Sequence, residues 1–255
     1  MSAPPAGRPR VLVVAGLDPT GGAGLVADLE AARAVGADAF LVASALTAQG
    51  PRGARGFEPA GEGMVLAQID ALLDGAGPRE RPRAVKTGML GTAGVARALA
   101  RRLSEPPLAR APLVVDPVLA ASSGAVLFDP GGAGAAAALA PLLARARLAT
   151  PNLPELEALT GRDVSSDEGA IRAARELPAR AVLVKGGHRA GAPVDLLVEG
   201  RRVTRFPGRR RRGTARGTGC RLASAIAGML ARSANLEEAI RAAKRGVERY
   251  LDRAP

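Results

Sequence analysis

The feature that most limits the fold of this chain is the alternation of short, wholly apolar runs with helical patterns. The runs Val11–Ala15, Leu113–Val115 and Ala181–Val184 contain no polar residue. Runs of this kind are typical of strands buried on both faces of a parallel sheet. Helical patterns separate them, as at 25–35 and 62–73. The alternation predicts an α/β chain with a mostly parallel central sheet and helices on both faces.

The length of 255 residues suits one α/β domain with a large core, and we find no internal repeat or dividing linker. We therefore expect a single domain over 1–255, with 1–10 as a flexible arm. A turn at Glu199–Gly200 between two apolar runs predicts a hairpin, so the sheet should end in antiparallel strands. The start of the chain lacks an apolar signal region, and no run of about twenty apolar residues occurs, which predicts a cytoplasmic protein. A single cysteine fits that compartment.

The formal net charge of +12 raises the question of a nucleic-acid partner. Only three of the 36 basic residues are lysines, and arginine, alanine, glycine and proline are abundant, as in a GC-rich coding background. The run Arg209, Arg210, Arg211 and Arg212 could contact phosphates, but a solvated loop is the commoner meaning of such a run. Aromatic residues make up 2% and tryptophan is absent, which argues against stacking on single strands. We do not expect nucleic acid as a partner.

The turn Gly217-Thr218-Gly219-Cys220 directly precedes a helical pattern. Its backbone N–H groups and the helix dipole predict a site for an anion such as a phosphate. Cys220 falls on the first helical turn, where the dipole, Arg216 and Arg221 should lower its thiol pKa and make it a candidate base. The alternative is a buried cysteine after an ordinary glycine-rich loop.

Other polar residues follow the predicted strands. Asp116 ends one apolar run and is either a magnesium or phosphate-side group or a helix cap. Lys185, followed by two glycines, suits a triphosphate. Asn152 and Glu155 form either a functional pair or a simple capping box. The only histidine, His188, is expected in a loop without a catalytic role. The glycine turn at 16–24 matches neither a Walker A loop nor a dinucleotide fingerprint.

Seven short motifs occur in a fixed order along nearly the whole chain. They are AGLDPTGGAG (15–24), ALTAQ (45–49), KTGML (86–90), VDPV (115–118), TPNLPE (150–155), VKGGH (184–188) and GTGC (217–220). The ordered set resembles the hydroxymethylpyrimidine kinase/phosphomethylpyrimidine kinase family of thiamine biosynthesis, within the ribokinase-like superfamily. The resemblance implies a ribokinase-like three-layer sandwich and a phosphotransferase that uses ATP and Mg²⁺.

The resemblance also implies roles for individual residues. It implies a pyrimidine pocket at Gly16, Asp28, Gln49, Met89 and Val118. It places Asn152 and Glu155 in a magnesium–phosphate motif, which with Asp116 makes Asp116 and Glu155 the candidate metal ligands. It makes Lys185 a ligand of the nucleotide phosphates and Cys220 the catalytic base, with Gly217, Thr218 and Gly219 around the phosphoryl group.

Some positions depart from the family pattern. Family members commonly have Thr-His before the GTGC motif and a small or hydroxyl residue after it, whereas this chain has Ala215-Arg216 and Arg221. Ser122 stands where a lysine is frequent. These changes affect positions that concern the second phosphorylation, in which the monophosphate is the acceptor. Arg216 or Arg221 is a candidate for the missing cation.

The sequence therefore predicts an ATP- and magnesium-dependent kinase of 4-amino-5-hydroxymethyl-2-methylpyrimidine and, as a second step, of its monophosphate. The resemblance also suggests a homodimer. A pyridoxal/pyridoxine kinase on the same scaffold is the alternative, but the Gln49 amide favours an aminopyrimidine because it can both donate and accept. A third possibility is a catalytically retired relative that acts as a binding or regulatory module through its basic loop.

Overall fold

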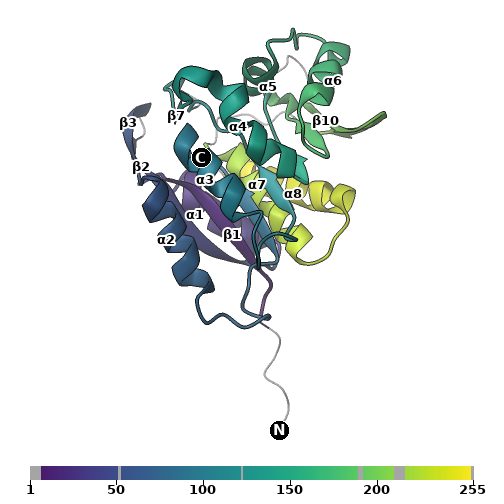
Figure 1. The fold of residues 1–255 in the computed structure, drawn as a ribbon. Coiled ribbons are helices and arrows are strands. Elements are labelled where there is room, and N and C mark those ends of the chain that lie inside the picture. Colours follow the sequence, from purple (N-terminus) through teal and green to yellow (C-terminus); the bar gives the residue numbers. More distant parts are fainter. Residues whose placement is uncertain (1–6, 51–52, 122, 189–191, 210–215, 254–255) are drawn as a thin grey trace.

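The computed structural model describes residues 7–50, 53–121, 123–188, 192–209 and 216–253. Their main sheet consists of β1 (Arg10–Leu17), β2 (Asp38–Gly50), β3 (Gly53–Pro59), β4 (Ala84–Thr87), β6 (Leu113–Val115), β8 (Leu148–Ala149), β9 (Val182–Val184), β10 (Val194–Glu199) and β11 (Arg202–Pro207). The strand order is β11-β10-β9-β8-β6-β4-β1-β2-β3 (Figure 1). Two short strands, β5 (Gly91–Thr92) and β7 (Phe128–Asp129), form a separate parallel pair.

The six central strands are parallel, and the three outer ones are antiparallel to their neighbours. The predicted hairpin is confirmed as β10 and β11. At the other edge, β2 continues to Gly50 and pairs with β3, a strand that the sequence did not indicate. The β3 segment, GARGFEP, has two glycines and a proline and hence little strand propensity. Its pairing with β2 makes it a strand.

Helices cover both faces of the sheet (Figure 1). One layer contains α1 (Gly24–Ala34), α7 (Thr218–Ala231) and α8 (Leu236–Leu251), and the other contains α2 (Glu62–Leu73), α3 (Ala93–Arg102), α4 (Gly134–Arg145), α5 (Leu153–Thr160) and α6 (Asp167–Glu176). Short 3-10 turns lie at Gly131–Ala133 and Gly186–His188. Along β1, Val11 and Val13 join the core under α1, α7 and α8, whereas Leu12 and Val14 join the opposite core. The predicted three-layer α/β sandwich is confirmed.

The helices predicted at 25–35 and 62–73 are confirmed within one residue. Asn235 caps α8, because its side chain accepts from the Glu238 N–H at 2.9 Å. Helices α4 and α6 were not predicted. The α4 segment is largely alanine, so its apolar positions give little contrast from which to read a helical period.

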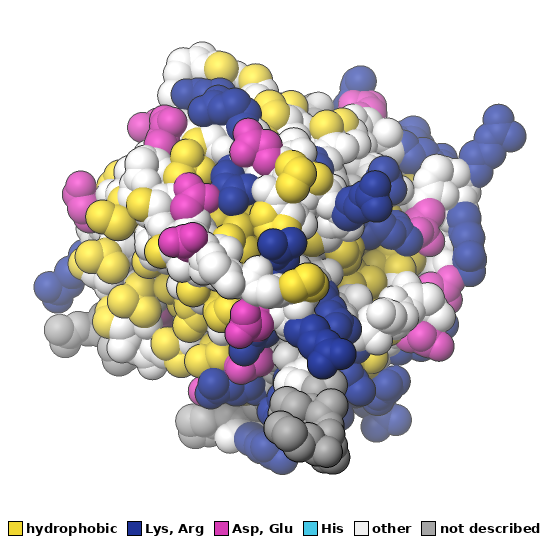
Figure 2. Space-filling model, turned by 60° about the horizontal axis from the view of Figure 1, so that its bottom comes forward, with side chains coloured by type: hydrophobic (Ala, Val, Ile, Leu, Met, Phe, Trp, Pro, Cys, Tyr) yellow, Lys and Arg dark blue, Asp and Glu magenta, His cyan; other side chains and the backbone are white. Residues whose placement is uncertain are grey.

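The surface carries both signs of charge. On the face drawn in Figure 2, Lys and Arg side chains are interspersed with acidic and apolar ones and do not form one continuous basic patch. Arg210, Arg211 and Arg212 of the basic run, Ser122, and residues 1–6 of the predicted arm lie outside the described residues. In the part of the chain that is described, none of the helices has the length and apolar character needed to cross a membrane.

Candidate active site

The carboxyl ends of the parallel strands bring three predicted site residues together. Asp116 follows β6, Lys185 follows β9, and Glu155 lies in the first turn of α5. The Lys185 Nζ atom is 2.7 Å from Asp116 Oδ1 and 3.6 Å from Glu155 Oε2. Asp116 Oδ1 also accepts from the Thr150 hydroxyl at 3.0 Å. One ammonium is therefore shared by two carboxylates at the edge where parallel α/β sheets bind ligands.

The charges of this cluster are set by burial and by the ion pairs. Burial alone would raise the pKa of Asp116, but the Lys185 and Lys86 ammoniums outweigh it and hold that pKa below its usual value. Burial raises the pKa of Glu155, although Lys185 opposes the shift. Burial would lower the pKa of Lys185, but its two carboxylate neighbours raise it above the usual value. Lys185 is therefore protonated and Asp116 is ionised at neutral pH.

Asn152 and Glu155 also form the capping box that was the alternative interpretation of this pair. Glu155 N–H donates to Asn152 Oδ1 at 2.8 Å, and Asn152 N–H donates to Glu155 Oε2 at 2.7 Å. The two interpretations are compatible, because the carboxylate that caps α5 is the same one that lies near Lys185.

The amino-terminus of α7 faces this cluster. A Cβ atom on Gly219 would lie 3.2 Å from Lys185 Nζ and 4.0 Å from Asp116 Oδ2. Gly217 caps the helix with a φ of 73°, and a Cβ there would lie only 2.2 Å from the Gly22 carbonyl oxygen. Gly217 therefore needs glycine, and at Gly219 a side chain would crowd the Lys185 ammonium. The GTGC turn packs on the glycine turn after β1, with its helix amides beside Lys185.

Cys220 differs from its prediction. Burial raises the pKa of the Cys220 thiol to about 11, and the Asp28 and Asp116 charges reinforce this against the favourable Lys86 charge. The expected lowering of the thiol pKa is therefore wrong. The main physical reason is the burial of the thiol, and the neighbouring arginines do not offset it. Arg221 binds Glu30 at 2.7 Å and lies over the Tyr250 ring. Arg216 points to the end of β2.

Asp28 forms a buried ion pair beside the site. It has no exposed surface, and both its carboxylate oxygens lie 2.8 Å from Lys86 Nζ, which is equally buried. The Ser224 hydroxyl donates to Asp28 Oδ1 at 2.8 Å. Asp28 is buried on α1, and its charge acts on the Cys220 thiol at the start of α7. The pyrimidine-pocket position that the resemblance implies for Asp28 stays a prediction.

Three other predicted pocket residues do come together. A Cβ on Gly16 would lie 2.7 Å from the Met89 sulfur, so glycine leaves room for that side chain. Met89 packs with Ala45 and Val118 in a small apolar cluster separate from the two main cores. Gln49 lies further along β2 and binds Arg216, whose Cβ lies near Gly22. The apolar cluster and the Gln49 amide therefore flank the glycine turn after β1.

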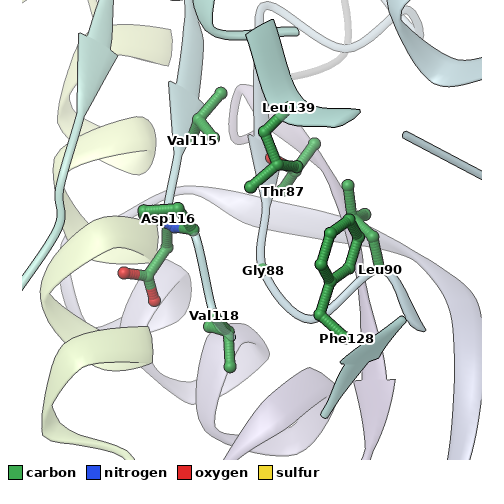
Figure 3. A pocket seen from close by; sticks show the side chains of 9 residues that line it. Thr87, Gly88, Leu90, Val115, Asp116, Val118, Phe128 and Leu139 are labelled. Carbon is green, nitrogen blue, oxygen red and sulfur yellow. The ribbon is translucent and has the colours of Figure 1, made fainter. Parts of the chain in front are cut away.

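A narrow apolar crevice adjoins Asp116. Figure 3 shows it lined by Thr87, Gly88, Leu90, Val115, Asp116, Pro117, Val118, Phe128 and Leu139. The Asp116 carboxylate points away from the apolar side chains, toward the yellow-green helix whose colour is that of α7 in Figure 1. Among the described residues, the fully buried Thr87 hydroxyl has no hydrogen-bond partner. The crevice connects the Asp116 site to the Val118 side of the apolar cluster.

Sequence reasoning missed the contacts of two residues in this region. Lys86 was noted only as part of a motif, although a lysine that follows the apolar pair Ala84-Val85 in a buried strand signals an internal ion pair. Arg216 was predicted to act on the Cys220 thiol or on a phosphate, but not to bind Gln49, which lies far from it in the sequence. No local pattern could have indicated that bond.

The residues present fit a magnesium ion held mainly through a nucleotide. The described residues contain no group of three or more His, Cys, Asp or Glu side chains arranged to hold a metal. Mg²⁺ is commonly bound through one or two carboxylates together with water and substrate phosphates. Asp116 and Glu155 supply two such carboxylates next to the anion-binding end of α7.

The layered fold and this edge cluster define a kinase of the ribokinase-like class, and comparisons with known proteins specify the family. The model of the phosphomethylpyrimidine kinase family matches residues 18–255, so the chain belongs to that family. It is 41% identical to a hydroxymethylpyrimidine/phosphomethylpyrimidine kinase of Streptomyces coelicolor, over 94% of this chain and 88% of that protein. It is 44% identical to a thiamine biosynthesis bifunctional protein of Geobacter sulfurreducens, over 93% of this chain. The chain spans only about half (48%) of that protein's length.

Solved structures give the same fold. The phosphomethylpyrimidine kinase of Clostridium difficile is 31% identical and superposes with a TM-score of 0.79, covering 96% of this chain and 100% of that one. An ADP complex of Bacillus subtilis pyridoxal kinase is 28% identical, with a TM-score of 0.80, and covers 93% of this chain and 89% of that one. Both kinds of vitamin kinase therefore share this scaffold.

Proposed function

We propose that this protein transfers the γ-phosphoryl group of ATP to the hydroxymethyl group of 4-amino-5-hydroxymethyl-2-methylpyrimidine, a step of thiamine biosynthesis. The main observation behind the proposal is that the amino-terminus of α7, which contains Cys220, lies next to Lys185 and Asp116. It combines an anion site, a cation and a carboxylate, which are the parts that phosphoryl transfer requires. The names of the 40–44% identical relatives support this acceptor.

The proposed reaction is an in-line displacement. The substrate hydroxymethyl oxygen forms a bond to the γ-phosphorus while the bond from that phosphorus to the ADP oxygen breaks, and the hydroxyl proton passes to the Cys220 sulfur. The amides of Gly217, Thr218, Gly219 and Cys220 and the Lys185 ammonium stabilise the charge on the transferred phosphoryl oxygens. A magnesium ion bound with ATP would be held by Asp116 and Glu155 and would neutralise phosphate charge.

The raised pKa of Cys220 constrains this proposal. At neutral pH the thiol is mostly protonated, so only a small thiolate fraction can accept the proton. Because the transition state of phosphoryl transfer is loose, most of the catalysis comes from positioning and charge neutralisation and the base adds to it. Cys220 as a base therefore implies a rate that rises with pH.

We propose the monophosphate as the second acceptor at the same site. Of the two candidate cations, Arg221 is engaged by Glu30 and by the Tyr250 ring. Arg216 lies beside Gly217 and the glycine turn, so it is the one within the site.

Pyridoxal is the competing acceptor, because pyridoxal kinases at 25–28% identity share the fold with TM-scores of up to 0.80. The test is kcat/KM for the pyrimidine alcohol and for pyridoxal. We expect the pyrimidine to be preferred because of the Gln49 amide. A preference for pyridoxal of more than about tenfold, some 1.4 kcal/mol of transition-state binding, would contradict the pyrimidine assignment.

We also propose a single-domain homodimer that works in the cytoplasm, where ATP is available. One sheet runs through the described residues, which supports one domain. Leu17 and Leu46 are register partners on β1 and β2 and are 37% and 56% exposed, which supports a contact with a second copy at this edge. Light scattering should give twice the chain mass, and Leu46→Glu should shift it toward the monomer.

A further inference from the structure

Arg216 stands immediately before the Gly217 turn, and its guanidinium is bound at three places. Nη2 donates to Gln49 Oε1 at 2.7 Å, and Nη1 donates to the Gly50 carbonyl oxygen at 3.3 Å. Nη2 also lies 3.3 Å from Asp18 Oδ2. Arg216 therefore connects the end of β2, the glycine turn after β1 and the start of α7.

The groups around this arginine are themselves fixed. The buried Asp18 carboxylate accepts from the Thr20 N–H at 2.9 Å and from the Ala23 N–H at 3.0 Å. The Tyr250 hydroxyl on α8 donates to the Arg216 carbonyl oxygen at 3.3 Å. Both the backbone and the side chain of Arg216 are thus held, so its bond to Gln49 is built into the site.

This bond determines which way the Gln49 amide faces. A guanidinium has only donors, whereas a glutamine amide has an acceptor end and a donor end. Gln49 must turn its oxygen toward Arg216, because a rotation by 180° would set two donors against each other. Within the described part of the chain, no acceptor receives the Gln49 NH₂ group. That donor and the second lone pair of Oε1 are available to a ligand, and their relative positions are fixed because the amide cannot rotate.

We propose that Arg216 is a specificity-determining residue that holds the Gln49 amide in one orientation. In that orientation the Gln49 NH₂ group donates to a ring nitrogen of the substrate, and Gln49 Oε1 accepts from an adjacent exocyclic amino group. The inference rests on the proposed function, in which Gln49 faces the pyrimidine ring. A 4-aminopyrimidine presents this order of acceptor and donor. The 4-oxo analogue presents the reverse, an N–H donor next to a carbonyl acceptor. A locked amide matches only the first, whereas a free amide can flip and match either.

The test compares kcat/KM for 5-hydroxymethyl-2-methylpyrimidine with a 4-amino group and with a 4-oxo group. The parent should prefer the amino compound by about tenfold to hundredfold, the discrimination expected of two correctly placed hydrogen bonds. Arg216→Met frees the amide, and its preference should fall to within about threefold. Arg33→Met is the matched control, because Arg33 is an exposed arginine that pairs with Asp38 away from the site. It should keep the parent's preference.

The possible outcomes separate this inference from the proposed function. A parent that phosphorylates neither pyrimidine refutes the function itself. A parent that phosphorylates the amino compound, together with an Arg216→Met variant of unchanged preference, refutes the lock alone. If Arg216→Met does not fold, Arg216→Gln keeps a polar side chain that can pair with either amide end, and it should show the same loss of preference. Failure of both variants to fold would make Arg216 a structural residue and overturn the assignment.

Discussion

At the scale of the single residue, Cys220 decides how much of the catalysis depends on a base. Cys220→Ser keeps the side-chain volume and the helix start but removes a group that can form an accessible anion. We expect kcat to fall on the order of 10²- to 10⁴-fold, with ATP and pyrimidine binding retained. Steady-state kinetics and calorimetric binding would measure both. Turnover within about threefold of the parent, in a normally melting variant, would refute the base.

The pH dependence of the same residue gives a second prediction. Burial raises the Cys220 pKa to about 11, so the thiolate fraction rises about tenfold for each pH unit below that value. If the thiolate is the base, kcat should still rise between pH 7 and 9.5 in the parent, and Cys220→Ser should lose this slope. Alkylation of the only cysteine should accelerate over the same range. A plateau of the alkylation rate near pH 8 would show that the pKa is not raised.

The buried ion pair of Lys86 and Asp28 links β4 to α1, and Ser224 of α7 joins it. Lys86→Met leaves a buried carboxylate without its partner, which costs about 3–5 kcal/mol of unfolding free energy. The double variant Lys86→Met/Asp28→Asn removes both charges and keeps an acceptor for Ser224, so it should recover most of the loss. Denaturant unfolding of the double-mutant cycle measures the coupling. A single variant that loses less than about 1 kcal/mol would contradict a charged pair.

At the scale of the element, the start of α7 depends on a glycine. Gly217 has a φ of 73°, and any Cβ there would overlap the Gly22 carbonyl oxygen. Gly217→Ala should therefore displace the glycine turn from the helix start and reduce kcat about 10²-fold, the loss seen when an anion-stabilising donor is removed. Gly200→Ala is the matched control, since Gly200 has a φ of 57° with open space around it.

The two alanine variants separate backbone strain from overlap. Gly200→Ala should cost only the about 1–2 kcal/mol of a left-handed alanine and leave kcat unchanged. Gly217→Ala should cost more in thermal stability than that. Equal losses of stability, with activity kept in both, would show that the close approach of the two turns does not hold the site together.

At the scale of the whole molecule, metal and nucleotide binding should be inseparable. The described residues offer two carboxylates but no complete metal cage, so Mg²⁺ alone should leave the melting temperature unchanged. ATP with Mg²⁺, at about a hundred times the dissociation constant, should raise it by about 5–10 °C. EDTA should abolish turnover without lowering the melting temperature of the free protein. A large rise with Mg²⁺ alone would reveal a pre-formed metal site.

The sequence by itself determined the layered architecture. Apolar runs such as Val11–Ala15 have no polar side chain to place in water, so they had to become strands covered on both faces, and the helices between them had to supply the cover. The same runs put Asp116 and Lys185 at one edge, because parallel strands end on the same side. The helix that begins after Gly217 was indicated by the local glycines and by the helical period of the apolar residues that follow them.

Only the tertiary structure decided what the side chains at that edge contact. Proximity on the helix suggested that Arg216 and Arg221 would act on Cys220, but a long guanidinium binds whichever acceptor the fold brings near, here Gln49 and Glu30. Asp28 is buried because its helix packs against β1, β2 and α7, where Lys86 of the neighbouring strand β4 and Ser224 of α7 reach it. The Cys220 pKa depends on burial, a property of the packed molecule that no local pattern contains. Strand β3 likewise exists because β2 offers it hydrogen bonds, and its own residues would not select that conformation.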